Sequence, residues 1–177
     1  MIGAIIGDIV GSRYEHNNIK TKEFDLFQKD MNFTDDTVMT IAIANALQKA
    51  NGDYSNLAKL AIQSMKYFGH KYPLAGYGSK FNRWLILPVT EPYNSFGNGS
   101  AMRTSPVAYF ANNEEEVKLL SKTVAEITHN HPEGIKGAEC VSMCIYYALH
   151  GKDKEFIKTQ VFNYYPRLND LNYDDLV

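Results

Sequence analysis

The run from Val38 to Leu47 is almost entirely apolar. A helix of this composition is apolar on nearly every face, so it is stable only where other parts of the chain bury it. Thr34-Asp35-Asp36-Thr37 stands before the run, where acidic side chains favour the positive end of a helix dipole. Asn51-Gly52 follows the run and is a typical helix stop. The sequence therefore predicts a buried helix between about residues 34 and 51.

The rest of the chain shows helical periodicity, while strand-like alternation and hairpin signals are scarce. We expect helices over residues 57–68 (capped by Asp53 or Ser55 and stopped by Gly69), 114–127, 133–149 and 153–165, with a short element at 80–85. A chain of 177 residues fits one domain better than two. The prediction is an all-α fold in a single domain spanning residues 1–177.

The first eleven residues place Gly3, Gly7 and Gly11 four apart, so in a helix they would form a stripe of small residues. We interpret this stripe as a site of close packing with another element. It is not a dinucleotide-binding fingerprint, because the G-x-G-x-x-G spacing is absent. Residues 12–32 are polar without a sustained period and are expected to form a loop.

The charge balance excludes several classes of partner. The chain has 18 basic and 20 acidic side chains, and no basic cluster suggests binding to nucleic acid or to an anionic membrane. No stretch approaches the roughly 20 apolar residues of a membrane-spanning helix. The two cysteines, Cys140 and Cys144, are too few for a disulfide scaffold and are interpreted as small buried apolar residues. We expect a cytoplasmic protein.

Two acidic segments contain residue types that carry chemistry. Thr34, Asp35 and Asp36 offer the hard oxygen ligands that Mg²⁺ or Ca²⁺ requires. The alternative is that they only cap a helix and complement its dipole. Glu15 follows the first expected helix, where it is either a general base or a surface residue.

Two further segments suggest ligand binding. The stretch from Ser95 to Arg103 combines small residues, free backbone N–H groups and a closing arginine, so it can cradle a phosphate, with Arg103 adding a bidentate contact. The alternative is a tight turn into a short helix. His129 and His131 precede a proline-started helix, where they are ligand contacts or caps.

In their order along the chain, four segments resemble the ADP-ribosylglycohydrolase family, which includes the dinitrogenase-reductase-activating glycohydrolase. They are Gly3 to Glu15, Thr34 to Thr37, Tyr93 to Arg103 and Thr128 to Gly134. The strings Thr-Asp-Asp-Thr and Asn-Gly-Ser-Ala-Met-Arg make the resemblance specific. It extends from residue 1 to about residue 150.

The resemblance implies an all-α fold with two Mg²⁺ ions at its centre. It implies cleavage of the glycosidic bond that joins ADP-ribose to a protein side chain or a small acceptor. Thr34, Asp35 and Asp36 match metal ligands, and Glu15 matches a carboxylate near the scissile bond, so Glu15 and Asp36 are the candidate catalytic residues. The expected substrate-binding residues are Ser95, Phe96, Gly97, Asn98, Gly99 and His129 from the resemblance, together with Arg103 from its place at the end of the loop.

Two departures from the family pattern affect these expectations. Full-length relatives end in a glycine-rich segment with Asp-x-Asp-Thr, whereas this chain ends at Asn172-Tyr173-Asp174-Asp175-Leu176-Val177. Leu74 and Ala75 stand where some relatives carry an aspartate. We therefore expect a chain truncated at its C-terminus, with weakened Mg²⁺ binding and exposed apolar surface where the absent helices would pack.

Two functions follow from this sequence. The first is a Mg²⁺-dependent hydrolase of ADP-ribosyl linkages, with a second polypeptide as one source of the missing part. The alternative is a catalytically impaired module that binds ADP-ribose or a related nucleotide.

Overall fold

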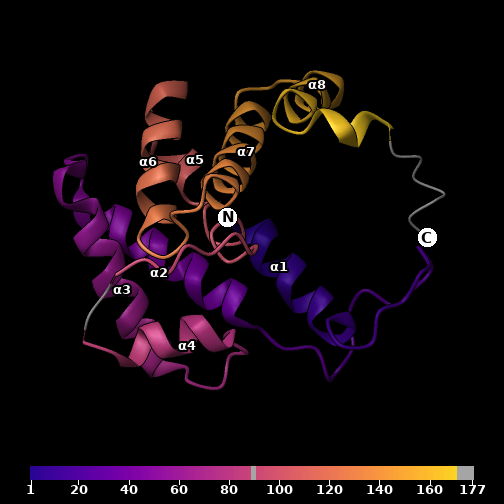
Figure 1. Ribbon diagram of the computed structural model, residues 1–177. Helices are drawn as coiled ribbons and strands as arrows, with labels where there is room; N and C mark the ends of the chain where they lie inside the picture. The colour runs from indigo at the N-terminus through magenta and orange to yellow at the C-terminus, as the bar shows by residue number, and fades with distance from the viewer. Residues whose placement is uncertain (89–90, 171–177) are drawn as a thin grey trace.

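Figure 1 shows the protein as a computed structural model, which describes residues 1–88 and 91–170. These residues form helices and loops, and no strand occurs among them, so the all-α prediction is confirmed. Asp174 and Asp175 lie outside the described residues. The elements, in chain order, are α1 (Ile2–Gly11), η1 (Ser12–Tyr14), α2 (Asp35–Ala50), η2 (Tyr54–Asn56), α3 (Leu57–Lys71), α4 (Ser79–Ile86), α5 (Val107–Phe110), α6 (Glu114–Glu126), α7 (Pro132–Leu149), α8 (Lys154–Tyr164) and η3 (Pro166–Asp170).

Helix α2 is the buried helix that the sequence predicts. Thr34 caps its start, since the side-chain oxygen of Thr34 accepts a hydrogen bond from the amide of Asp36. Asn51 ends it in the left-handed conformation, with φ of 48°. The helix packs against α1, α3 and α5. Its fully buried apolar side chains are Met39, Ala42, Ile43, Ala46 and Leu47.

Helix α3 continues past Gly69, so the predicted stop at this glycine is wrong. A Cβ atom at position 69 would lie 2.7 Å from Cδ2 of Leu85, a buried side chain of α4. The absence of a side chain therefore lets α4 approach α3 closely. This contact positions α4, which contributes Lys80 and Phe81 to the cavity described below.

Helices α6 and α7 begin and end close to their predicted positions and pack against each other. Figure 1 shows this pair in orange, with α8 on the outer side of α7. Asp153 caps α8 by accepting a hydrogen bond from the amide of Phe156 at 2.8 Å. The single-turn helix α5, which the sequence analysis did not predict, lies against α7.

The glycine stripe of α1 does not pack closely against another element, so that interpretation is wrong. Nothing lies within 4 Å of the place where a Cβ atom would be at Gly3, Gly7 or Gly11. No residue of α1 is buried, although most of its side chains are apolar, and Ile2 is 72% exposed. Helix α1 thus contacts α2 but leaves apolar side chains such as Ile2 and Ile6 uncovered by the described residues.

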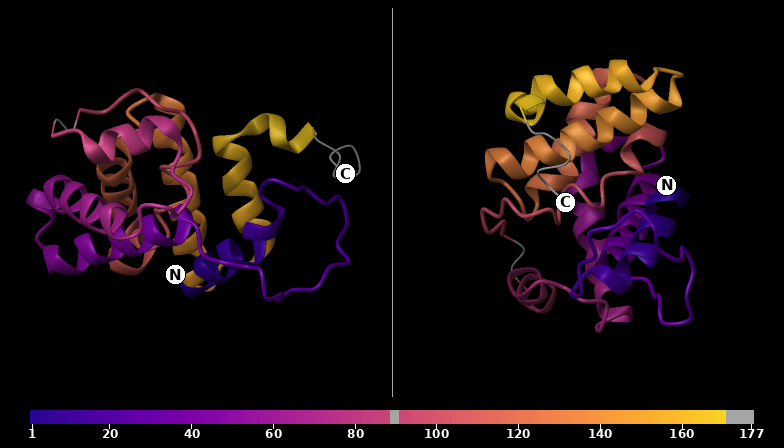
Figure 2. Two further views of the ribbon diagram at one scale, coloured as in Figure 1. Left: turned by 90° about the horizontal axis from the view of Figure 1, so that it is seen from below. Right: turned by 90° about the vertical axis from the view of Figure 1, so that its right-hand side faces the viewer.

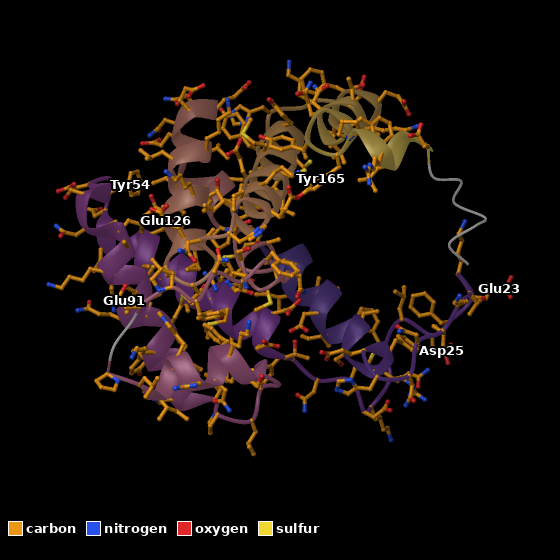
Figure 3. The ribbon with its side chains drawn as sticks, viewed as in Figure 1. Glu23, Asp25, Tyr54, Glu91, Glu126 and Tyr165 are labelled. Atoms are coloured by element: carbon orange, nitrogen blue, oxygen red, sulfur yellow. The ribbon has the colours of Figure 1, made fainter. Side chains whose placement is uncertain are left out.

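A long open loop joins α1 to α2, as the sequence predicts for residues 12–32. Figure 2 shows this loop standing away from the helices, and Figure 3 places Glu23 and Asp25 on its outer part. Among residues 1–88 and 91–170, no helix combines the length and the apolar character needed to cross a bilayer.

Candidate functional site

Five separate segments of the chain line one cavity of about 440 Å³. The turn after η1 contributes Glu15, the start of α2 contributes Asp35 and Asp36, and His129 comes from the turn before α7. The remaining residues belong to α4 with the turn before it and to the loop between α4 and α5: Gly76, Gly78, Ser79, Lys80, Phe81, Tyr93, Ser95, Gly97, Asn98, Gly99, Met102 and Arg103. Carboxylates, a glycine-rich loop and a histidine thus face a common space.

A second cavity, of about 530 Å³, adjoins the first. The two share Glu15, Asp36, Asn98 and Met102 as lining residues. The other wall of the second cavity is α1, through Ala4, Gly7, Asp8 and Gly11. Glu15 and Asp36 therefore lie between the glycine-rich loop and the open face of α1.

Asp8 fixes the start of α2. Its carboxylate accepts hydrogen bonds from the amide and hydroxyl of Thr34, at 2.8 and 2.6 Å, and from the amide and hydroxyl of Thr37, at 3.1 and 2.5 Å. These charge-assisted bonds join α1 to the turn that carries Asp35 and Asp36. Sequence reasoning gave Asp8 no role, although its being the one acidic residue in an apolar helix was a usable signal.

The carboxyl groups of Asp35 and Asp36 are partly buried and close to other acids. Burial, followed by the negative charge of Asp36, raises the pKa of Asp35 to about 6. Burial, followed by the charges of Asp8 and Glu15, raises the pKa of Asp36 to about 6. Among the described residues, no basic side chain forms an ion pair with either carboxylate. The site therefore concentrates negative charge that no basic side chain of the described residues neutralises by an ion pair.

This donor set fits a hard divalent cation. Asp35 and Asp36 supply carboxylate oxygens, and the Thr34 hydroxyl keeps one free lone pair after donating to Asp8 and accepting from the Asp36 amide. In residues 1–88 and 91–170, no group of three or more His, Cys, Asp and Glu side chains is arranged to hold a metal. Mg²⁺ is compatible with so few protein ligands, because it retains several waters.

The loop from Ser95 to Ser100 is anchored on the turn before α7 and on the first turn of that helix. The Ser100 hydroxyl donates to the carbonyl of Gly134 at 2.8 Å, and the amide of Asn94 donates to Oδ1 of Asn130 at 2.8 Å. A Cβ atom at position 134 would lie 2.7 Å from the carbonyl oxygen of Ser95. The loop thus rests directly on the backbone of α7.

Arg103 points into the protein rather than toward a bidentate ligand contact. Its side chain is 1% exposed, and Nη2 donates to the carbonyl of Val124 at 2.7 Å and to Oγ1 of Thr128 at 2.8 Å. Burial lowers the pKa of Arg103 to about 10, so it stays charged at neutral pH. No carboxylate pairs with it among the described residues. Its positive charge therefore acts on the cavity mainly through the low-dielectric interior.

The structure brings most of the predicted site residues together, while their roles stay predictions. Those that line the first cavity are Glu15, Asp35, Asp36, Ser95, Gly97, Asn98, Gly99, Arg103 and His129. Thr34 instead lines the second cavity. Phe96 does not line the first cavity: its side chain is 71% exposed, and its ring lies 5.2 Å from the ring of His131, centroid to centroid.

Tyr93 and Thr128 belong to the site but were given no role from the sequence. The amide of Tyr93 donates to the carbonyl of Thr128 at 3.2 Å, and the rings of Tyr93 and His129 lie 5.8 Å apart. Both residues stood in the quoted family segments. Nothing in their types or spacing indicated contact, because Tyr93 and Thr128 are 35 residues apart in the sequence.

Comparisons with known proteins find one family and several relatives. The model of the ADP-ribosylglycohydrolase family matches residues 1–175. The ADP-ribosylhydrolase ARH3 of Gallus gallus is 26% identical over 211 residues, which cover 99% of this chain and 55% of that protein. The Homo sapiens ARH3 is 27% identical, covering 89% of this chain and 52% of that protein. The ADP-ribosylhydrolase ARH1 of Dictyostelium discoideum is 28% identical, covering 72% of this chain and 37% of that protein.

The chain thus spans about half the length of the ARH3 proteins it matches. The identities to single relatives are low, so the assignment to a family rests on the family model, which matches residues 1–175. The chain belongs to the ADP-ribosylglycohydrolase family.

Proposed function

We propose that this chain carries the ADP-ribose-binding cavity and part of the catalytic centre of a Mg²⁺-dependent hydrolase. The enzyme would release ADP-ribose from a protein side chain or a small acceptor. The observation that carries the proposal is the single cavity in which Asp35, Asp36 and Glu15 meet the Ser95–Gly99 loop and His129. This arrangement offers separate places for an anionic diphosphate and for a reacting sugar.

The Ser95–Gly99 loop and the residues behind it support the binding of a diphosphate. Glycine-rich backbone exposes N–H groups that can donate to phosphate oxygens. The buried charge of Arg103 lies behind the loop without an acidic partner among the described residues, and a buried cation favours an anion nearby. The diphosphate of ADP-ribose fits the site at this loop better than a neutral ligand does.

The carboxylates support the placement of the ribose and of the attacking water. Asp35 and Asp36 would hold Mg²⁺, with Thr34 beside them. When bound, the ion supplies positive charge that orients ribose hydroxyls and makes a water more acidic. In the reaction, the water oxygen bonds to the anomeric carbon while the bond to the acceptor breaks, and the acceptor takes up a proton. Glu15, which lines both cavities, is placed to remove the proton of the water, and Asp36 is the alternative base.

A second polypeptide segment would complete the centre. The described residues offer only two acidic ligands and the Thr34 hydroxyl, and the chain spans about half the length of the relatives it matches. The face of α1 that carries Ala4, Gly7, Asp8 and Gly11 borders the second cavity next to Asp36. A segment docked on this face would stand where further ligands are needed.

The alternative function is a module that binds ADP-ribose without cleaving it. The loop and His129 favour this alternative, because they do not depend on a complete metal centre. The two functions differ in their need for Mg²⁺ and for the carboxylates.

Calorimetry with ADP-ribose, first with Mg²⁺ and then with a chelator, tests the proposal. We expect binding that weakens on chelation and in D35N and D36N variants, and an unchanged affinity in D53N, which alters an exposed cap away from the cavity. Metal-independent binding that persists in D35N would favour the binding module. No binding in any condition would refute a ligand site in this chain. Release of ADP-ribose from ADP-ribosylated protein then tests turnover.

A further inference from the structure

A chain of hydrogen bonds runs from Arg103 through Thr128 to His129 behind the Ser95–Gly99 loop. Nη2 of Arg103 donates to Oγ1 of Thr128 at 2.8 Å, and this Oγ1 lies 2.8 Å from Nδ1 of His129. All three residues are buried, with exposed fractions of 1%, 0% and 4%. The chain thus connects a buried cation to a ring that lines the cavity.

The ring of His129 is uncharged at neutral pH. Burial, followed by the nearby positive charge of Arg103, lowers the pKa of His129 to about 4. The other titratable group against the ring is Tyr93, whose pKa is raised by burial, so it stays protonated. A neutral imidazole carries one N–H, and its other nitrogen is an acceptor.

The hydroxyl of Thr128 decides which nitrogen carries the proton. It has one proton and two acceptor sites, and Arg103, which can only donate, occupies one acceptor site. If Nδ1 of His129 carried the proton, it would donate to the second acceptor site of the Thr128 hydroxyl. The hydroxyl would then have to donate its own proton to Tyr93, which is within hydrogen-bonding reach. Imidazole nitrogen is a far stronger base than a phenol oxygen. Donation from Arg103 also polarises the threonine O–H. The hydroxyl therefore donates to Nδ1.

We infer that Arg103 and Thr128 are positioning residues that hold His129 in its Nε2–H tautomer, so that the ring presents a neutral N–H donor to the anionic part of the ligand. The Nε2 edge lies against the loop, since a Cβ atom at Gly99 would be 3.0 Å from both Cε1 and Nε2. In the described part of the chain, no residue accepts a hydrogen bond from Nε2. This inference rests on the proposed function for the identity of the ligand and not for the tautomer.

Nitrogen-15 NMR of the histidine side chains tests the tautomer without any ligand. His129 is assigned by the signals that disappear in H129Q. We expect a pyrrole-type Nε2 and a pyridine-type Nδ1 in the unmodified protein, unchanged between pH 7 and pH 5.5. A pyrrole-type Nδ1, or protonation of the ring within this range, would overturn the inference. The tautomer is read in the unmodified protein, and only the assignment uses a variant, H129Q.

Matched variants test the part played by the hydroxyl. T128S keeps the hydroxyl and should retain the Nε2–H tautomer, whereas T128V removes it and should give a mixture of tautomers. Y93F should leave the tautomer unchanged, and a switch to Nδ1–H in Y93F or no change in T128V would contradict the inference. ADP-ribose affinity should fall by roughly three- to tenfold in T128V and be restored in T128S. A correct tautomer together with no ADP-ribose binding would refute the proposed function and leave the tautomer assignment standing.

Discussion

Asp8 on α1 and Thr34 at the start of α2 are joined by two hydrogen bonds, from the amide and the hydroxyl of Thr34 to the two oxygens of one carboxylate. The same carboxylate also binds both donors of Thr37. A helix that is otherwise exposed is thereby fixed to the turn that presents Asp35 and Asp36. The link explains how the first cavity obtains its acidic wall in a chain whose first helix contributes no buried side chain.

Replacing Asp8 should destabilise the protein although α1 is exposed. D8N keeps one acceptor oxygen and puts an NH₂ donor in place of the other, which now accepts hydrogen bonds, so we expect the free energy of unfolding to fall by about 2 kcal/mol. Urea unfolding measures this change. D170N, at an exposed position in η3 without a hydrogen bond, is the control and should change stability by less than about 0.5 kcal/mol. Equal free energies of unfolding of D8N and D170N would show that the hydrogen bonds of Asp8 do not contribute to stability.

The acidic pair should make the stability of the metal-free protein fall as pH rises. The pKa values of Asp35 and Asp36 are about 6 in the folded protein and near 3.8 in the unfolded chain. Between these values the folded state binds more protons, so the free energy of unfolding decreases with pH across this window. Allowing for solvent screening of partly exposed groups, the decrease is on the order of 1–2 kcal/mol.

Urea unfolding at pH 4.5 and pH 6.5 in the presence of a chelator measures this effect. The D35N/D36N variant should lack the decrease, and added Mg²⁺ should stabilise the unmodified protein more at pH 6.5 than at pH 4.5, because only ionised carboxylates bind it. The raised pKa values of Asp35 and Asp36 would be contradicted if the free energy of unfolding rose from pH 4.5 to pH 6.5 and D35N/D36N did not change this rise.

A side chain at position 134 should displace the ligand loop. The Cβ atom of G134A would lie 2.7 Å from the Ser95 carbonyl oxygen, so the loop or the start of α7 must move. We expect ADP-ribose affinity to fall by about tenfold while the helix content is retained. G137A lies one turn further along the same helix, where a Cβ atom meets only ordinary contacts, the nearest at 3.5 Å. G137A should bind normally, and equal affinities of the two variants would show that the loop does not rest on Gly134.

The sequence predicts the helices well because their signals are local. Thr34 and Asn51 mark the ends of α2 within one turn. The run between them is apolar on nearly every face, so this helix must be buried in the core. Gly69 was misread for the opposite reason, since its meaning depends on Leu85, which is 16 residues away in sequence and in another helix. A glycine that permits close packing and a glycine that ends a helix look alike in a single sequence.

The candidate site shows the same division between local and distant information. Nine residues of the first cavity were recognisable from short strings, whereas those from α4 and the turn before it were not, and neither were the partners that orient the site. Asp8 is 26 residues from Thr34, and Arg103 is 25 residues from Thr128. Arg103, expected at the ligand, lines the first cavity, and only the tertiary structure shows that its guanidinium also donates to the carbonyl of Val124 near the end of α6.

Substitutions on α1 should reveal whether its apolar face needs a partner. Ile2 and Ile6 are 72% and 46% exposed, so the isolated chain should self-associate at high concentration through this face. The I2E/I6E variant should stay monomeric in sedimentation velocity runs over a concentration series, with the free energy of unfolding changed by less than about 0.5 kcal/mol. L74E is the control, because Leu74 is 97% exposed but lies outside α1, and it should associate like the unmodified chain. A chain that is monomeric at every concentration would show that this apolar face does not drive self-association.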